Sequence, residues 1–273
     1  MLFRSPTVEV PKKQLEPSTE NVLYLISTTD NQTFREDCYV DIETNLIELM
    51  RRLEACRKAQ IEVFNFVSSW FVYGPDYTYP DENSVCNPNG FYSVTKYAAE
   101  KLVKEYCLTF GIPYRILRLG NVYGGPDTGS PKRNALHYLV NKLKNHADIN
   151  VHINVSRDFI HILDTCRALA FLCEHGDTNA VYNIGTGIAT RLGDALDSAK
   201  RLMYSSGYVL RSNVPTNYNQ AVRFALDCGK LKSHGFQPLI SFEEGLRDLC
   251  LHQKFCTPDP TLMELKLKQQ SPA

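Results

Sequence analysis

The chain has 273 residues, of which 43% are hydrophobic and 22% charged, a composition that excludes a disordered, collagen-like or coiled-coil protein. Its 30 basic and 30 acidic residues give a formal net charge of zero, so we expect no nucleic acid or membrane as a partner. The length predicts one compact unit with a secondary lobe.

The nine cysteines are odd in number and fall in expected helices and strands as often as in loops. This favours a reducing compartment over a disulfide scaffold. No Cys-x-x-Cys pair occurs and no histidine has ligand spacing to a cysteine, so we expect no metal site. The first residues lack the apolar core of a secretory signal, and no uncharged apolar run reaches the roughly 20 residues of a membrane span. These features predict a cytoplasmic protein.

Strands and helices are predicted to alternate along the first half of the chain. Residues 22–26 form a short apolar run, typical of a strand buried on both faces. Apolar residues then recur at three- and four-residue intervals over 41–59, which predicts a helix with one buried stripe. Residues 63–67 form the next apolar run and predict a second strand.

The same alternation continues with a helix over 91–110, ended by Gly111 and Pro113, and a strand over 114–119. Strand, helix, strand, helix, strand predicts parallel pairing through right-handed crossovers. Beyond Gly120 the pattern loosens into a loop rich in Gly and Pro, a helix over 134–144 and several short segments. This half is expected to form a smaller lobe interleaved with the end of the sheet.

Three side chains at one edge of the predicted sheet form a candidate proton-transfer site. Ser69 ends the second strand, and Tyr92 and Lys96 lie four residues apart at the start of the next helix. Residues at this spacing have Cβ atoms about 5–6 Å apart, so we expect Lys96 to lower the pKa of the Tyr92 phenol. Ligands of open parallel sheets lie at the carboxyl edge, where Ser69 and Tyr92 would share a substrate oxygen. The pattern predicts a site that acts on an alcohol.

Further motifs follow this group in a fixed order. They are 118–124 (Arg-Leu-Gly-Asn-Val-Tyr-Gly), 157–161 (Arg-Asp-Phe-Ile-His), 182–187 (Tyr-Asn-Ile-Gly-Thr-Gly) and 242–246 (Phe-Glu-Glu-Gly-Leu). With these motifs the chain resembles, from about residue 22 to 249, the extended short-chain dehydrogenase/reductase family of NAD-dependent nucleotide-sugar epimerases and dehydratases. Each motif alone is weak evidence, whereas together, in the family's order and spacing, they are specific.

The resemblance implies an α/β fold, a Rossmann-like parallel sheet lacking its first strand-helix units, with a smaller substrate-binding lobe. The shortened Rossmann-like domain would cover residues 1–125 together with sheet segments near 155–190, and the interleaved nucleotide-sugar-binding lobe would cover 126–273. Tyr92 would be the general base, Ser69 would bind the same sugar hydroxyl, and Lys96 would bind the nicotinamide ribose, with Ser27 and Tyr92 also at the cofactor.

The resemblance also implies a set of substrate-binding residues. Besides Ser69, Asn121, Asn134 and Arg157 fall where family members contact the nucleoside diphosphate, and a guanidinium suits phosphate oxygens. Arg223 is the candidate for a basic residue that the family carries before its last short strand. For Arg157 the alternative is a surface ion pair with Asp158 or Asp164. For Asn45, which matches an asparagine of the family, helix packing is the alternative to an active-site contact.

Two departures from the family pattern bear on function. Dehydratases of the family carry an Asp-Glu pair after the catalytic hydroxyl, and here these positions hold Trp70 and Phe71, which cannot transfer protons. The family's Gly-x-x-Gly-x-x-Gly loop, which receives the cofactor pyrophosphate, is also absent, and roughly 60 residues, about two βαβ-scale units, are missing relative to the family. We therefore expect weak NAD binding and an unpaired edge on the shortened sheet.

The sequence favours an NAD-dependent nucleotide-sugar epimerase that inverts C4 through a transient keto sugar. The alternatives are a truncated relative that binds a nucleotide sugar or a partner without turnover, and a nucleotide-sugar reductase. NADP remains an alternative to NAD. The resemblance further implies a homodimer in which the 91–110 helix and the preceding helix pair with their counterparts.

Overall fold

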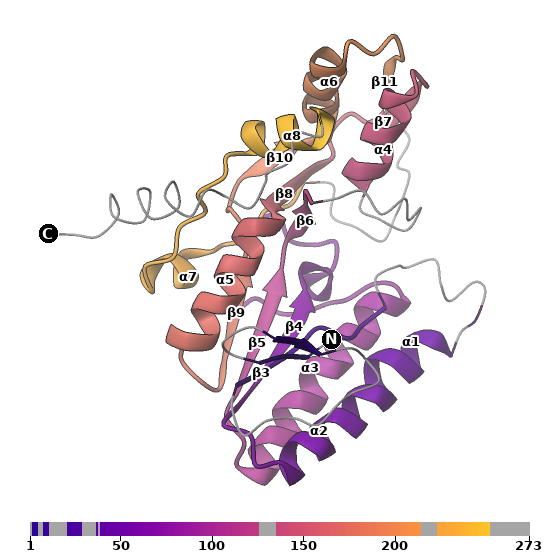
Figure 1. Cartoon of the computed structure of the whole chain (residues 1–273). Helices are drawn as coiled ribbons and strands as arrows, with labels where there is room; N and C mark the ends of the chain where they lie inside the picture. Colours follow the sequence, from indigo (N-terminus) through magenta and orange to yellow (C-terminus); the bar gives the residue numbers. More distant parts are fainter. Residues whose placement is uncertain are drawn as a thin grey trace, which may run out of the picture.

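The computed structural model describes residues 2–4, 8–10, 21–28, 37, 39–125, 135–213 and 223–251, with the backbone alone for the first two ranges. Figure 1 shows a larger sheet with helices on its faces and, above it, a smaller lobe built from the later part of the chain.

The larger sheet has six strands in the order β2-β1-β3-β4-β5-β9. In chain order they are β1 (Leu2–Arg4), β2 (Val8–Val10), β3 (Asn21–Tyr24), β4 (Val63–Ser69), β5 (Tyr114–Leu119) and β9 (Ala180–Ile184). The last four of these strands are parallel neighbours, so the predicted parallel pairing is confirmed. Their carboxyl ends lie at one edge of the sheet, where a ligand site is expected.

The prediction of an unpaired edge beside the first parallel strand is wrong. β1 pairs antiparallel with β3, with Leu2 opposite Tyr24 and Arg4 opposite Val22, and β2 pairs antiparallel with β1. Two strands of three residues are too short to show an alternating pattern in the sequence, so the hairpin gave no sequence signal. It supplies the backbone hydrogen bonds that β3 would otherwise lack.

The first helical segment runs without interruption through α1 (Val40–Ile42), the π-helical turn η2 (Glu43–Ile47) and α2 (Glu48–Lys58), close to the predicted 41–59. Short π-helical turns widen a helix by one residue and occur frequently at functional sites. Asn45 is buried in this turn, so the widened turn carries a residue that the sequence had linked with the site.

The second long helix, α3 (Phe91–Phe110), has the bounds that the sequence predicts. Gly111 ends it in a left-handed conformation with φ of 67°, and its N–H donates to the carbonyl of Cys107. Glycine adopts this conformation without steric cost, and Pro113 follows closely because it cannot continue a helix. The start of α3 lies beside the carboxyl end of β4, where Lys96 reaches the Val67 carbonyl and Tyr92 reaches Ser69.

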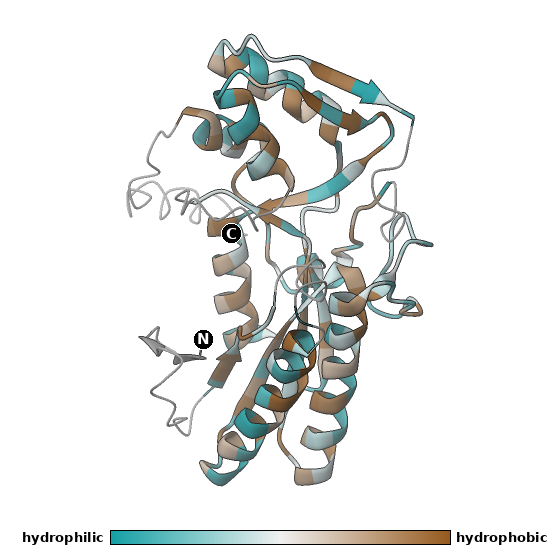
Figure 2. Ribbon diagram, turned by 90° about the vertical axis from the view of Figure 1, so that its right-hand side faces the viewer, coloured by the Kyte–Doolittle hydropathy of each residue, from teal (hydrophilic) through white to brown (hydrophobic). Residues whose placement is uncertain are grey.

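Alternate residues of the strands pack on opposite faces of the sheet. Phe64 and Phe66 of β4 pack in the core shared with α2 and α3, whereas Val67 packs in the core shared with α5 (Ile162–His175). The sheet therefore lies between a layer of two helices and α5 (Figure 2). Burial on both faces explains why the strands are nearly continuous apolar runs.

Within the described residues, the smaller lobe holds two small sheets, β10-β8-β6 and β11-β7, together with three helices. In chain order the remaining elements are β6 (Asn121–Tyr123), α4 (Ala135–Lys144), β7 (Ile149–His152), β8 (Ser156–His161), β10 (Ala189–Arg191), α6 (Leu192–Met203), β11 (Val209–Ser212), α7 (Gly229–Ser233) and α8 (Phe242–Leu251). The helix predicted over 134–144 is confirmed from residue 135, and Asn134 lies outside the described residues.

The described part of the chain holds seven cysteines, all of them free thiols. None of the helices in that part combines the length and the apolar character that crossing a membrane requires.

Candidate active site

Ser69 is the last residue of β4 and lies at the carboxyl edge of the sheet. Its Oγ accepts a hydrogen bond from the backbone N–H of Phe71, at 3.4 Å, and so caps a 3₁₀-helical turn, η3 (Trp70–Tyr73). Such a cap satisfies an N–H that the short helix leaves without a partner. The turn fixes the direction in which the chain leaves the strand, and with it the position of the Ser69 hydroxyl.

Tyr92 lies in the first turn of α3 and is 9% exposed. Burial raises the pKa of Tyr92 to about 12, and the nearby Asp41 carboxylate adds to this, while hydrogen bonds with the hydroxyls of Ser69 and Ser27 oppose it. The structure therefore brings together the phenol and the two predicted serine hydroxyls. At neutral pH the phenol is protonated and can exchange its proton with an oxygen placed beside it.

Lys96 is buried one turn further along α3, at 3% exposure. Its Nζ donates to the carbonyl of Val67 at 2.7 Å and lies 4.5 Å from the centre of the Phe66 ring, so it contacts β4. Burial lowers the pKa of Lys96 to about 7, and the Glu100 carboxylate opposes this shift. The predicted lowering of the Tyr92 pKa by Lys96 is not seen here: burial raises that pKa, and the Lys96 ammonium lies against the Val67 carbonyl.

Asn45 connects the loop after β3 with the start of α3. Its Oδ1 accepts from the Ser27 hydroxyl and from the Thr28 N–H, both at 2.9 Å, and its Nδ2 donates to Thr28 Oγ1 at 2.8 Å and Thr95 Oγ1 at 3.0 Å. Thr28 also donates to the buried Asp41 carboxylate. Thr28, Thr95 and Asp41 had no sequence signal, because their partners lie far away along the chain.

Trp70 and Phe71 surround the reactive end of β4 with aromatic rings. Phe71 meets Tyr92 edge to face, with ring centres 5.9 Å apart. Trp70 stacks on Phe71, with ring centres 4.3 Å apart, and packs against Phe224 in a tilted arrangement at 4.2 Å. The two positions where dehydratases carry acid and base therefore hold apolar walls that cannot accept or donate a proton.

Arg157 is buried in β8, at 9% exposure, rather than lying on the surface as an exposed ion pair would. Its Nη1 donates to the carbonyl of Ser156 at 2.8 Å, and its guanidinium carbon lies 5.4 Å from the centre of the Trp70 ring. Burial lowers its pKa to about 10. The guanidinium thus lies over the ring of Trp70, the residue that directly follows Ser69.

The carboxylate of Asp158 joins three separate segments of the chain. It accepts hydrogen bonds from the N–H and the hydroxyl of Thr186, at 2.8 and 2.6 Å, from the N–H of Gly187 at 2.9 Å and from the N–H of Leu226 at 3.2 Å. A Cβ on Gly185 would lie 2.5 Å from Asp158 Oδ2, which explains the glycine there. Asp158 is therefore a bracing residue.

Two predicted substrate residues lie next to this brace. Asn121 is half-buried in β6, and its Nδ2 donates to the carbonyl of Asp158 at 3.3 Å. Arg223 is exposed, and its backbone pairs with Ser156, the neighbour of Arg157. The structure thus groups Asn121, Arg157 and the backbone of Arg223 around β8, while Asn134 lies outside the described residues.

The site fits one part of a dinucleotide. The hydroxyls of Ser27 and Tyr92 meet beyond the end of β3, and the ammonium of Lys96 lies against the Val67 carbonyl of the neighbouring β4, so donors and acceptors that a nicotinamide ribose needs lie at one edge of the sheet. For the pyrophosphate, the chain contains no Gly-x-x-Gly-x-x-Gly turn. These residues therefore fit the nicotinamide half of the cofactor.

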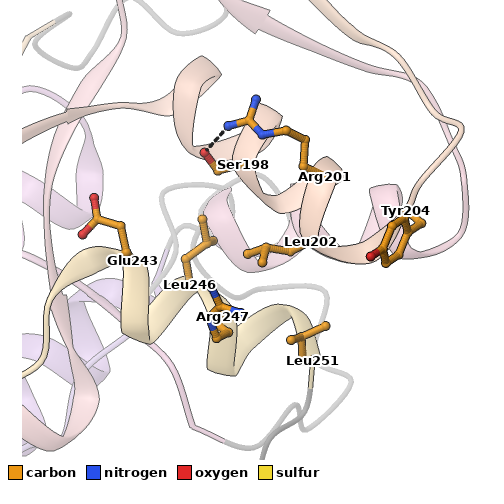
Figure 3. A pocket seen from close by; sticks show the side chains of 8 residues that line it. All are labelled: Ser198, Arg201, Leu202, Tyr204, Glu243, Leu246, Arg247 and Leu251. Carbon is orange, nitrogen blue, oxygen red and sulfur yellow. Dashed lines mark hydrogen bonds between the residues drawn. The ribbon is translucent and has the colours of Figure 1, made fainter.

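A separate cavity of about 520 Å³ lies between α6 and α8. Figure 3 shows its lining, in which Arg201 turns toward Ser198 and donates to its hydroxyl at 2.9 Å. Leu202, Leu246 and Leu251 supply the apolar part of the wall. None of the site residues described above lines this cavity, so it is distinct from the Tyr92 site.

Comparison with known proteins points to one family. The family model described as "NAD dependent epimerase/dehydratase family" matches residues 22–185. A provisionally named UDP-glucose 4-epimerase of Methanocaldococcus jannaschii is 32% identical over 216 residues, which cover 78% of this chain and 70% of that protein. The low-salt glycan biosynthesis protein Agl12 of Haloferax volcanii is 29% identical over 214 residues, which cover 75% of this chain and 66% of that protein.

Solved structures show the same fold. The UDP-glucose 4-epimerase of Thermotoga maritima, solved with UDP-glucose, superposes with a TM-score of 0.78 at 24% identity, covering 85% of this chain and 76% of that one. The UDP-glucose 4-epimerase of Thermus thermophilus, solved with NAD, gives a TM-score of 0.76 at 24% identity, covering 88% and 79%. The predicted Rossmann-like α/β class is thereby confirmed.

Proposed function

Because the chain belongs to the NAD-dependent epimerase/dehydratase family, we propose that it is a nucleotide-sugar 4-epimerase. The observation that carries this proposal is the meeting of Tyr92 with the Ser69 and Ser27 hydroxyls at the carboxyl edge of the sheet, behind apolar walls. An alcohol oxygen placed against Tyr92 and Ser69 would find a proton acceptor and a hydrogen-bond donor.

The proposal gives each of the residues a role that its position supports. To act as the base, the Tyr92 phenol must first ionise, which the positive charge of a bound NAD would favour. The phenolate then takes the proton of the sugar hydroxyl and returns it to the same oxygen after the configuration is inverted, while Ser69 holds that oxygen. Ser27, Tyr92 and Lys96 would hold the nicotinamide ribose. When bound, NAD supplies the acceptor and donor of hydride at the sugar carbon. Arg157, Asn121 and Arg223 would contact the diphosphate of the substrate, and the cation of Arg157 suits its oxygens.

The walls at Trp70 and Phe71 support epimerisation over dehydration. Elimination of water from the sugar needs groups that remove a proton from one carbon and protonate a leaving hydroxyl. Neither ring can do so, whereas inversion at C4 needs only Tyr92 on the protein side. A nucleotide-sugar reductase would use the same residues, so the identity of the sugar product distinguishes an epimerase from a reductase.

Incubation of the chain with UDP-glucose and a high concentration of NAD tests the proposal, with the products resolved by proton NMR. We expect slow formation of UDP-galactose. Formation of a 4-keto-6-deoxy sugar would instead overturn the assignment of the Trp70 and Phe71 walls.

A second candidate is a module that binds a nucleotide sugar or a partner without turnover. The absence of a Gly-x-x-Gly-x-x-Gly turn from these 273 residues favours it. Under this candidate UDP-glucose binds to the Arg157 side of the site, yet no product forms at any NAD concentration. Calorimetry with UDP-glucose, run beside the product assay, separates the two candidates.

A further inference from the structure

Trp70, the single tryptophan of the chain, is at the centre of a stack of aromatic rings. It directly follows Ser69 and is 3% exposed. Its ring lies 4.3 Å from that of Phe71, with an interplanar angle of 24°, and 4.2 Å from that of Phe224, at 37°. Rings held by two neighbours in this way have little freedom to move, so the indole is a rigid surface.

The guanidinium of Arg157 rests on this indole, 5.4 Å from the ring centre. Tryptophan is the aromatic side chain that attracts cations best, and the attraction is larger where water is excluded. The backbone of the same region holds the arrangement together. The carbonyl of Ser156 accepts both from Arg157 Nη1, at 2.8 Å, and from the N–H of Phe224, at 3.2 Å.

We propose that Trp70 is a positioning residue for Arg157, whose guanidinium it holds in the orientation that binds the diphosphate of a nucleoside diphosphate. This inference rests on the proposed function, in which Arg157 meets that diphosphate. A guanidinium fixed before binding loses less side-chain entropy when it forms paired hydrogen bonds with phosphate oxygens. Trp70 would therefore have two effects: it helps Arg157 to bind the diphosphate, and it replaces an acidic residue that dehydration would need.

A desolvated guanidinium also needs compensation for the water it has lost. Burial lowers the pKa of Arg157, which shows that its charged form is less stable here than in water. The face of Trp70 offers part of that compensation, because an aromatic face attracts a cation.

Calorimetric titration with UDP and with uridine tests the proposal on the intact chain. We expect Trp70→Leu to weaken UDP binding about tenfold, as the loss of a desolvated cation–π contact implies, and to leave uridine binding unchanged. A residue with a merely structural role would weaken both ligands alike. In an Arg157→Ala background the Trp70 substitution should cause no further loss, because the group that it positions is gone.

Phe236→Leu is the matched control. Phe236 is also buried, at 4% exposure, and carries a guanidinium, that of Arg167, 5.2 Å above its ring, in a different part of the fold. This variant should bind UDP as the unmodified chain does. Unchanged UDP affinity in a folded Trp70→Leu variant overturns the inference, as does an equal loss of uridine binding.

The tryptophan itself provides a measurement that needs no substitution at Trp70. Diphosphate oxygens that engage Arg157 change the field on the indole, so UDP should shift the fluorescence of the unmodified chain, and uridine should not. UDP binding that calorimetry detects without a fluorescence change would overturn this inference and leave the proposed function standing. No UDP binding at all overturns the proposed function, and this inference with it.

Discussion

The guanidinium of Arg118 and the carboxylate of Glu100 form a buried two-point ion pair, with Nε–Oε1 at 3.0 Å and Nη2–Oε2 at 2.7 Å. Their side chains are 6% and 3% exposed. Glu100 also accepts from the hydroxyl of Ser68 at 2.5 Å. The pair fastens α3 to β5 and β4 one turn after Lys96, so it sets the distance between the helix that carries Tyr92 and the strand that carries Ser69.

Glu100→Ala should lower the free energy of unfolding by about 3–5 kcal/mol, because it leaves Arg118 buried without its counter-charge. Urea unfolding of the variant and the unmodified chain measures the difference. Asp197→Ala is the control, since Asp197 pairs with the exposed Arg211 at 2.6 Å and should contribute less than about 1 kcal/mol. Similar losses in the two variants would show that the buried pair has no special role.

Lys96 should make stability rise with pH. Its pKa is about 7 in the folded chain and returns to the ordinary, higher value on unfolding. Between these values the unfolded chain binds more protons, so stability increases by about 3 kcal/mol from pH 7 to 9.5 and levels off above the unfolded pKa.

Lys96→Met should remove this contribution, which is measured as the difference in unfolding free energy between the variant and the unmodified chain at the two pH values. Lys104→Met, at an exposed position on the same helix, should keep the pH dependence of the unmodified chain. A Lys96→Met variant with that same pH dependence would show that the buried ammonium is charged equally in both states.

The sequence predicted the parts of the fold that depend on local patterns. The helix from Phe91 to Phe110 and the strand Tyr114–Leu119 have the predicted bounds. Gly111 ends the helix and Pro113 cannot continue it, so the boundary is visible in the sequence. Ser69 and Tyr92 meet because strand ends and the following helix starts share one sheet edge.

The remaining site contacts join residues that are distant in sequence. Asp158 appeared in the sequence only as an ion-pair alternative for Arg157, whereas its carboxylate receives N–H groups from segments around residues 186 and 226. Likewise, nothing near Trp70 in the sequence indicates that Arg157 rests on its ring. Contacts of this kind depend on tertiary packing, and local patterns in one sequence do not show which distant residues pack together.

Asp158→Asn should destabilise the chain by about 2–4 kcal/mol. Both carboxylate oxygens accept hydrogen bonds, whereas an amide keeps one accepting oxygen and places an NH2 group, itself a donor, against the remaining donors. The same variant should weaken UDP-glucose binding, because the turn at Thr186 and the segment at Leu226 lose their common anchor. Thermal unfolding and calorimetry measure the two effects. A stable variant with normal binding would contradict the bracing role.

NAD should bind weakly to this 273-residue chain, because the contacts proposed for Ser27, Tyr92 and Lys96 would reach only the nicotinamide ribose and the sequence has no Gly-x-x-Gly-x-x-Gly turn for the pyrophosphate. Fluorescence titration should show no saturation in the micromolar range. ADP, which lacks the nicotinamide ribose, should bind more weakly still. Tight binding of NAD by the chain itself would show that another segment holds the pyrophosphate.

The role of Tyr92 in proton transfer is tested most directly by comparing Tyr92→Phe with the unmodified chain in the conversion of UDP-glucose at high NAD concentration. The substitution keeps the ring against Phe71 and removes the phenolic oxygen. We predict that formation of UDP-galactose falls by a factor of about 10²–10⁴ or below detection, while calorimetry shows unchanged affinity for UDP-glucose. A Tyr92→Phe variant that forms product at the rate of the unmodified chain, or that loses substrate binding instead of turnover, would contradict the assignment of Tyr92 as the general base.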